Sequence, residues 1–239
     1  MPSIVITGAS RGLGKAIAEL FAKYQNRLFL SAKNNESLDR TVKDLISRYP
    51  ELEISSKAFD LGKSEGARAL GDWVLEHESR VDVLVNNAGS FIPGNILDEA
   101  EGNLETLLQV NLGSAYHLSR KLLPAMMAQP IVKGTRGHIF NICSIASLQA
   151  YPQGGSYSIS KFALAGFSKN LREELKQSAI KVTAVYPGAI FTDSWAGTVV
   201  DESRILEAAD IAAMIYAACN LSPQAAVEEI LIRPQLGDL

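Results

Sequence analysis

The feature that most constrains this chain is a glycine-rich turn between an apolar strand and a helix near its start. Residues 4–6 form an apolar, β-branched run, and Gly8, Gly12 and Gly14 follow it before helical periodicity begins. Glycine permits a tight turn and lets backbone N–H groups approach a bound group closely. A second apolar run at 27–31 closes a strand–helix–strand unit, so the chain begins as α/β structure.

Strands and helices alternate along the rest of the 239 residues. We expect helices at 35–48, 63–78, 155–177 and 208–219, two helices or one kinked helix over 100–128, and strands at 52–58, 81–85, 137–144, 180–186 and 226–232. Regular alternation predicts an α/β fold with a mostly parallel, doubly wound sheet. No linker, repeat or low-complexity stretch interrupts the pattern, so residues 1–239 are predicted to form a single domain.

Composition excludes several classes of protein. The net charge of −3 argues against a nucleic-acid partner, and no run approaches the ~20 apolar residues of a membrane span. The N-terminus lacks the basic and apolar regions of a signal peptide. The two cysteines, Cys143 and Cys219, are not spaced as a metal or redox motif, and the three histidines are scattered. We therefore expect a cytoplasmic protein without a metal site.

The glycine turn and the second strand together predict the cofactor. A glycine turn directly after the first strand favours binding of a pyrophosphate at the helix N-terminus. An acidic residue at the end of the second strand would hold the 2′-hydroxyl of NAD, but Lys33 stands there and Arg11 lies in the turn. Two cations suit a 2′-phosphate, which predicts NADP(H). Asp60 could accept a hydrogen bond from the adenine or cap the helix expected from residue 63.

A tyrosine and a lysine, Tyr157 and Lys161, stand four residues apart in the helix expected over 155–177. That spacing puts both side chains on one face, about 6 Å apart along the helix axis. An ammonium beside a phenol stabilises the phenolate, so the pair is a candidate acid or base near neutral pH.

Further motifs occur in a fixed order along the chain. They are Thr7-Gly8-Ala9-Ser10-Arg11-Gly12-Leu13-Gly14, Asn86-Asn87-Ala88-Gly89, Asn111-Leu112-Gly113, Ser144, the Tyr157/Lys161 pair, and Pro187-Gly188 with Thr192. In this order, with Ser144 thirteen residues before Tyr157, essentially the whole chain resembles the short-chain dehydrogenase/reductase family. The resemblance implies a Rossmann fold with a seven-stranded parallel sheet, helices on both faces, and oxidoreductase activity.

The resemblance also implies a role for each matching position. Tyr157 would donate a proton to a carbonyl, Lys161 would activate it and bind the nicotinamide ribose, and Ser144 would hydrogen-bond the substrate oxygen. Asn111 would hold a water that links the lysine to solvent. The cofactor contacts would be Gly8, Ser10, Arg11, Gly12, Leu13, Gly14, Lys33, Asp60, Leu61, Asn87, Ala88, Gly89, Tyr157, Lys161, Pro187, Gly188, Ile190 and Thr192. Cys143 and Ser147 depart from frequent family residues, but neither removes a catalytic group.

Three loops at the carboxyl ends of strands carry aromatic groups, at 90–93, 148–151 and 189–207. They suit an apolar carbonyl substrate, although packing of the last loop as a lid would explain them equally well. The run at 227–234 resembles the end of bacterial members related to sepiapterin reductase and small diketone reductases. We expect an NADPH-dependent reductase of a ketone or diketone, with a 3-oxoacyl-[acyl-carrier-protein] reductase or a pterin reductase as alternatives.

A non-enzymatic alternative is an NADP(H)-sensing regulatory protein, which we would expect to have lost the serine, the tyrosine or the lysine. All three are present. By resemblance, a homodimer or homotetramer would form through the helix after Asn111 and the helix that carries Tyr157. Candidate contact residues are Leu118, Leu122, Leu123, Met126, Phe162, Ala165, Phe167 and Leu171, and burial in the core of one chain would produce the same pattern.

Overall fold

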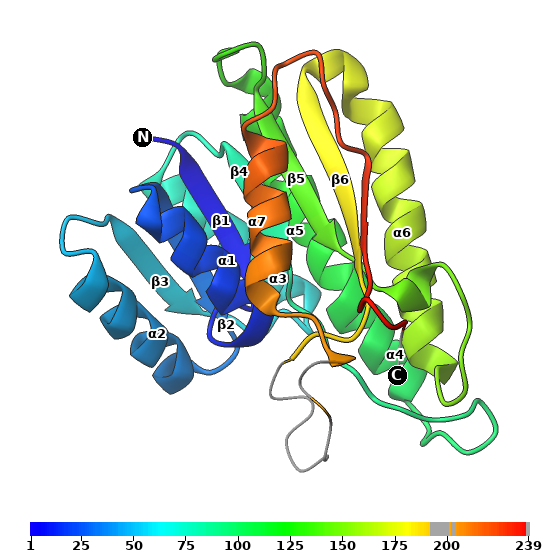
Figure 1. Cartoon of the computed structure of the whole chain (residues 1–239). Coiled ribbons are helices and arrows are strands. Elements are labelled where there is room, and N and C mark those ends of the chain that lie inside the picture. Colours follow the sequence, from blue (N-terminus) through cyan, green and yellow to red (C-terminus); the bar gives the residue numbers. More distant parts are fainter. Residues whose placement is uncertain (192–200, 202–203, 238–239) are drawn as a thin grey trace.

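Seven parallel strands form one sheet in the part of the chain that the computed structural model describes, residues 1–191, 201 and 204–237 (Figure 1). They are β1 (Ser3–Thr7), β2 (Arg27–Ala32), β3 (Ile54–Ala58), β4 (Val83–Asn86), β5 (Gly137–Ile142), β6 (Ile180–Pro187) and β7 (Glu229–Ile232). Their order is β3-β2-β1-β4-β5-β6-β7. The chain winds outward from β1 to β3, returns beside β1 as β4, and continues the other way. The expected doubly wound sheet is therefore confirmed.

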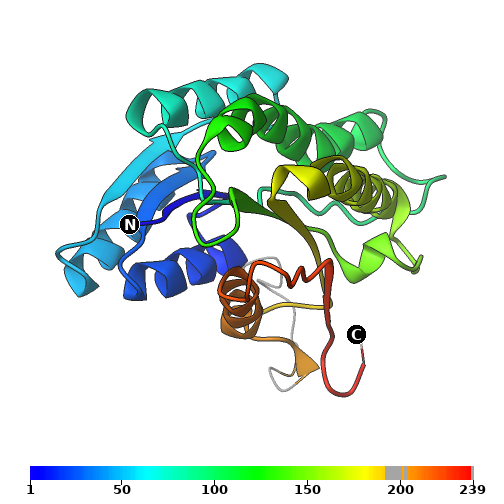
Figure 2. The same ribbon diagram turned by 90° about the horizontal axis from the view of Figure 1, so that it is seen from above.

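Helices cover both faces of the sheet, as Figure 2 shows. One face carries α1 (Gly12–Lys23), α2 (Asn35–Arg48) and α7 (Ala208–Cys219). The other face carries α3 (Ser64–His77), α5 (Ser114–Ala128) and α6 (Gly155–Leu175), with the short α4 (Asn103–Leu108) packed against α6. The arrangement agrees with the sequence expectation, and the bounds of α2 and α7 coincide with the predicted ranges.

Side chains of the central strands alternate between the two faces. On β1, Ile4 and Ile6 join the apolar cluster beneath α1, α2 and α7, whereas Val5 joins the cluster beneath α3, α5 and α6. All five residues of β1 are buried. Burial on both faces explains why these strands are continuous apolar runs rather than alternating patterns.

The segment expected as two helices or one kinked helix over 100–128 is continuous from α4 through a π-helical turn, η1 (Gln109–Gly113), into α5. A π turn widens the hydrogen-bonding ring by one residue and is frequent at functional sites. Asn111 lies in this turn and is 1% exposed. The turn thus carries a buried polar side chain, which bonds to Ser90 and to Ser160 of α6.

The segment between β3 and α3 tests the helix-cap interpretation of Asp60. The N-cap of α3 is Lys63, not Asp60. The carboxylate of Asp60 instead accepts a hydrogen bond from the Gly62 N–H at 3.2 Å and pairs with Lys33. The helix-cap interpretation of Asp60 is therefore wrong.

The carboxyl ends of the strands share one edge of the sheet because all strands are parallel. This edge is at the bottom of Figure 1, where α6 also begins. It brings together the glycine turn after β1, the Asn87–Gly89 segment after β4, Ser144 after β5 and Gly188 after β6. None of the helices in the described residues is long and apolar enough to cross a membrane.

Candidate active site

The glycine turn after β1 is built for close backbone approach. Gly8 and Gly12 have φ of +64° and +52°, the left-handed region that side chains disfavour. A Cβ on Gly14 would collide with the carbonyl oxygen of Gly8. Helix α1 starts at Gly12 without a side-chain cap or an acidic residue in its first turn. Its first N–H groups therefore suit an anion, and the turn fits the pyrophosphate of a dinucleotide.

Asparagine and threonine side chains hold this turn against the end of β4. The amide of Asn87 donates to the carbonyl oxygens of Thr7, at 2.9 Å, and Gly8, at 3.2 Å. The Thr7 hydroxyl oxygen accepts from the N–H groups of Asn87 and Ala88, both at 2.9 Å. These contacts join β1 and β4 at the point where the strand order reverses, the usual ligand crevice of such sheets.

Lys33, at the end of β2, forms an ion pair of 3.3 Å with Asp60 at the end of β3. Burial would raise the pKa of Asp60, but the hydrogen bonds from Lys33 and the Gly62 N–H outweigh it and lower the pKa. The Lys33 side chain is 78% exposed, so its ammonium can reach a bound group. The Ser10 carbonyl of the glycine turn accepts a hydrogen bond from the Thr41 hydroxyl of α2, which holds the turn against this helix.

The Lys161 side chain lies between α6 and the end of β5. It is 6% exposed, and its Nζ donates to the Ile142 carbonyl at 2.8 Å. The same nitrogen lies 5.9 Å from the centre of the Tyr157 ring. An ammonium has three donors, so others remain for a bound group. The structure therefore brings the predicted tyrosine and lysine together at the ligand edge.

Ser144 begins a short 3₁₀ turn, η2 (Ile145–Ser147), that packs against α6. Its hydroxyl oxygen accepts from the Ala146 N–H at 3.1 Å, and its own N–H donates to the Ser147 hydroxyl at 3.2 Å. Because backbone occupies the acceptor side of the Ser144 hydroxyl, its hydrogen is available for a ligand oxygen. Ser147, noted in the sequence only as a departure from a frequent family residue, thus orients Ser144.

Asn111 links three segments of the site. Its side chain accepts from the Ser90 N–H at 2.7 Å and donates to the Ser90 carbonyl at 3.0 Å. It also donates to the Ser160 hydroxyl at 2.8 Å, and Ser160 in turn donates to the Tyr157 carbonyl at 2.7 Å. A Cβ on Gly89 would lie 3.0 Å from Asn111 Oδ1 and 3.6 Å from Lys161 Nζ, so a side chain there would crowd both.

The remaining predicted cofactor residues occupy different settings. Leu13 and Leu61 are buried in the two apolar clusters, and Arg11 is exposed at the start of α1. Pro187 ends β6, the Gly188 N–H donates to the Ile232 carbonyl at 2.8 Å, and Ile190 forms a bridge with Leu206. Thr192 lies outside the described residues, as do Asp193, Trp195 and most of the lid expected over 189–207.

Within the described residues, the predicted substrate loops contribute one aromatic contact at the site. The ring of Phe91 meets the ring of Tyr157 edge to face, with 4.8 Å between their centres. Phe91 is half exposed. Burial raises the pKa of Tyr151, in the neighbouring loop, to about 12. Sequence reasoning missed Glu99, which bonds to Ser156 beside Tyr157. No spacing in the sequence signals a contact between residues so far apart.

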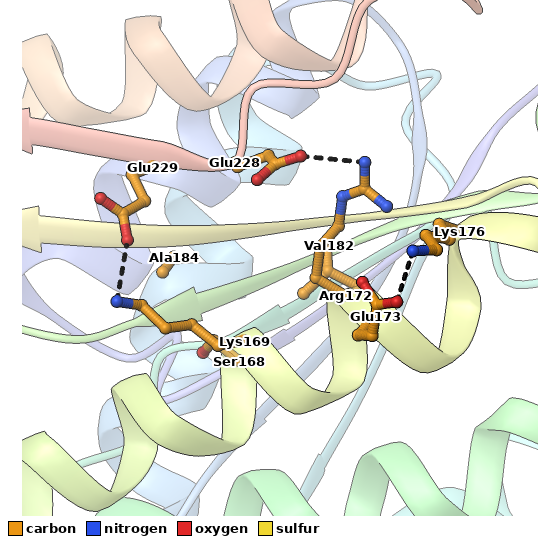
Figure 3. A pocket seen from close by; sticks show the side chains of 9 residues that line it. All are labelled: Ser168, Lys169, Arg172, Glu173, Lys176, Val182, Ala184, Glu228 and Glu229. Atoms are coloured by element: carbon orange, nitrogen blue, oxygen red, sulfur yellow. Dashed lines mark hydrogen bonds and ion pairs between the residues drawn. The ribbon is translucent and has the colours of Figure 1, made fainter.

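A separate hollow of about 450 Å³ lies along the second half of α6 and is drawn in Figure 3. Its charged side chains are paired with one another, Lys169 with Glu229 at 3.6 Å, Arg172 with Glu228 at 2.9 Å, and Lys176 with Glu173. Ser168, which lines the hollow, lies eleven positions after Tyr157 on the helix, about 16 Å along the axis. The hollow is therefore distinct from the catalytic edge.

Both cysteines are free thiols, and burial raises their pKa values, to about 11 for Cys143 and about 12 for Cys219. Because the thiolate is the nucleophile, we expect Ellman's reagent to modify them at least ~100-fold more slowly in the native protein than in urea. Absorbance during labelling measures this, and a Cys219→Ser variant isolates Cys143. Cys143 is buried and Cys219 is partly buried, so rapid labelling of native Cys143 would contradict this expectation most directly.

Comparisons with known proteins agree with this geometry. Residues 2–203 match the model of a family described as short chain dehydrogenase. The chain is 31% identical to the sepiapterin reductase of Chlorobaculum tepidum, over 99% of this chain and 97% of that protein.

Two solved structures share the fold. One is a metagenomic short-chain oxidoreductase in complex with NADP, with a TM-score of 0.83 and 34% identity over 98% of this chain and 97% of that one. The other is the L-sorbose reductase of Gluconobacter frateurii complexed with NADPH and L-sorbose, with a TM-score of 0.87 and 27% identity over 98% and 95%.

Proposed function

Because the chain belongs to the short-chain dehydrogenase family, we propose that it is an NADPH-dependent reductase of a ketone or diketone carbonyl. The observation that carries this proposal is the position of Lys161. Its buried ammonium bonds to the carbonyl of Ile142 at the end of β5 and lies near the Tyr157 ring. Complexes of the similar proteins with NADP and NADPH support the cofactor. The set of Ser144, Tyr157 and Lys161 favours an enzyme over a regulatory sensor.

The residues at the glycine turn would hold the cofactor, which supplies the hydride when bound. We assign the pyrophosphate to the turn from Gly8 to Gly14 and the 2′-phosphate to Lys33 and Arg11. Asp60 and Leu61 would flank the adenine, and Asn87, Ala88 and Gly89 would pass the ribose. Pro187, Gly188, Ile190 and Thr192 would hold the nicotinamide end, with the free donors of Lys161 on its ribose.

The catalytic work of the protein is to stabilise and protonate an oxygen. Reduction builds negative charge on the substrate oxygen, and the free hydrogen of the Ser144 hydroxyl can donate to it. Tyr157 gives the proton, and the Lys161 ammonium stabilises the negative charge that remains on the phenol. Asn111 holds the π turn against Ser90 and Ser160. By its match to the family position, we assign to Asn111 a water that would connect Lys161 to solvent.

A substrate panel tests the proposal. We expect loss of NADPH absorbance with ketones or diketones and weaker loss with 3-oxoacyl thioesters. The similarity to a sepiapterin reductase favours a pterin ketone as the second candidate, so pterins belong in the panel. Absence of turnover with every carbonyl, together with tight NADPH binding, would instead support the regulatory sensor.

We also propose that residues 1–239 act as one domain in the cytoplasm and assemble as a homodimer or homotetramer through α5 and α6. Most of the predicted contact residues lie in the core of the chain, since Leu118, Leu122 and Met126 are fully buried. An apolar stripe along a helix does not by itself say whether the core of the same chain or a second chain covers it. The apolar residues exposed on these helices include Tyr116, Met127, Ile159 and Phe162.

A charge at Phe162 should separate the subunits. We expect light scattering to give the mass of two or four chains for the wild type and of one chain for Phe162→Asp. The proposed interface would bury the new carboxylate without a partner, which is costly. Ile46→Asp, at an equally exposed apolar position on α2, is the matched control and should keep the wild-type mass. A monomeric wild type would contradict the assembly.

A further inference from the structure

The start of α6 has an unusual partner. The first N–H groups of a helix have no partner within the helix, and here Gly154, the N-cap, supplies no side chain. A carboxylate from a distant loop takes that place. Glu99 accepts a hydrogen bond from the Ser156 N–H at 2.7 Å through Oε1, and from the Ser156 hydroxyl through Oε2. Ser156 is 4% exposed and directly precedes Tyr157.

The local backbone is shaped around this carboxylate. Gly155 has a φ of +26°, and a Cβ on it would collide with Glu99 Oε1 and with the Gly94 carbonyl oxygen. The absence of a side chain at 155 therefore makes room for the carboxylate. A negative charge at this place also complements the positive end of the helix dipole.

The loop that supplies Glu99 is also bonded to the segment that directly precedes α6. The Gly94 N–H donates to the Gln153 carbonyl at 2.9 Å, and the Gln153 N–H donates to Asn95 Oδ1 at 3.3 Å. At the other end of the loop, Asn111 holds Ser90. In Figure 1 this loop, between β4 and α4, and the loop before α6 lie at the lower right of the molecule.

The contact between Glu99 and Ser156 affects the position of two aromatic side chains, Phe91 and Tyr157. Phe91 is in the same loop as Glu99, and its ring contacts the ring of Tyr157. Movement of the first turn of α6 would shift Tyr157 relative to Ser144, Lys161 and Phe91 together. Displacement of a reacting group by about 1 Å can cost about 100-fold in rate.

We propose that Glu99 is a positioning residue that clamps the first turn of α6 to the loop 90–99 and so fixes Tyr157 and Phe91 for reaction. The inference rests on the proposed reductase function for its kinetic consequence alone. The clamp itself has a consequence that does not depend on turnover, the protection of the Ser156 N–H from solvent exchange.

Hydrogen–deuterium exchange and kinetics test the clamp. In Glu99→Ala we expect the amides at 155–158 to exchange at least ~10-fold faster, because a buried donor loses its charged acceptor. We expect kcat to fall about 10- to 100-fold, while the Kd for NADPH and the circular dichroism spectrum stay unchanged. Glu99→Gln should recover most of kcat, since an amide can still accept from the N–H and bond the hydroxyl.

Two further variants separate the clamp from a general loss of stability. Glu101→Ala, at an exposed position two residues along, removes a charge from the same loop and should leave exchange and kcat unchanged. Ser156→Ala removes only the hydroxyl contact, so its effect should be smaller, and Glu99→Ala/Ser156→Ala should resemble Glu99→Ala alone.

The outcomes are distinguishable. If Glu99→Ala leaves exchange at 155–158 unchanged, or if Glu101→Ala accelerates it equally, the clamp is overturned. If exchange rises but kcat does not fall, the clamp exists and its positioning of Tyr157 is refuted. If the wild type reduces no carbonyl, the proposed function fails, and the exchange measurement alone still decides whether Glu99 clamps the helix.

Discussion

Replacement of Tyr157 with phenylalanine should lower kcat about 10³-fold and leave the Kd for NADPH within about threefold of the wild type. Phenylalanine keeps the ring and its edge-to-face contact with Phe91, which has 4.8 Å between ring centres, and removes the hydroxyl alone. The loss then reports the proton donor rather than a change in packing. Stopped-flow absorbance of NADPH oxidation and fluorescence titration of NADPH measure the two quantities.

The matched control is Tyr24→Phe. Tyr24 stacks on Tyr216, on the face of the sheet that carries α1 and α7, with 4.3 Å between ring centres. Loss of that hydroxyl should leave kcat and Kd at wild-type values. Substantial turnover by Tyr157→Phe would show that another group protonates the substrate, and a parallel loss of NADPH binding would assign Tyr157 to the cofactor instead.

Exchange of Lys33 for aspartate should change the ratio of kcat/KM for NADPH to that for NADH by about 100-fold in favour of NADH. Lys33 already lies 3.3 Å from Asp60. The variant replaces a cation that can bond a 2′-phosphate with a second carboxylate, which repels the phosphate and can accept from a 2′-hydroxyl. A charge-assisted hydrogen bond is worth about 1.5–3 kcal/mol, enough for a change of this size.

Lys43→Asp makes the same change of charge at an exposed position of α2 and controls for the net charge of the protein. It should leave the cofactor ratio unchanged. A wild type that prefers NADH would refute the NADP(H) assignment outright. A ratio unaffected by Lys33→Asp would place the 2′-phosphate on Arg11 or elsewhere in the glycine turn.

The elements of the fold could be predicted because their signals are local. Apolar runs and helical periodicity are properties of neighbouring residues, and α2 and α7 have the predicted bounds. Where the signal was equally local but ambiguous, the sequence left two interpretations open, and the structure excludes one of them. Aspartate is a common helix cap, and Asp60 stands just before a helix. Its carboxylate instead forms an ion pair with Lys33, because β2 and β3 are neighbours in the sheet.

The candidate site was only partly accessible from the sequence. Tyr157 and Lys161 share a helix, so their proximity follows from helical geometry. Nothing local indicates that the carbonyl of Ile142 receives the Lys161 ammonium, or that the Ser144 hydroxyl oxygen already accepts a backbone N–H. The apolar faces predicted for assembly show the same limit, because Leu118 and Phe162 have similar patterns but opposite exposure.

The sequence by itself determined the alternation of strands and helices, the glycine turn and the order of the catalytic motifs, because each depends on spacing within one segment. Only the tertiary structure decided which segments meet at the ligand edge. Glu99 reaches Ser156 across 57 residues, and Asn111 reaches Ser90 and Ser160 from a π turn. The physical reason is that these contacts depend on strand order and on how α4 and α6 pack. Neither can be read from the pattern of neighbouring residues in the sequence.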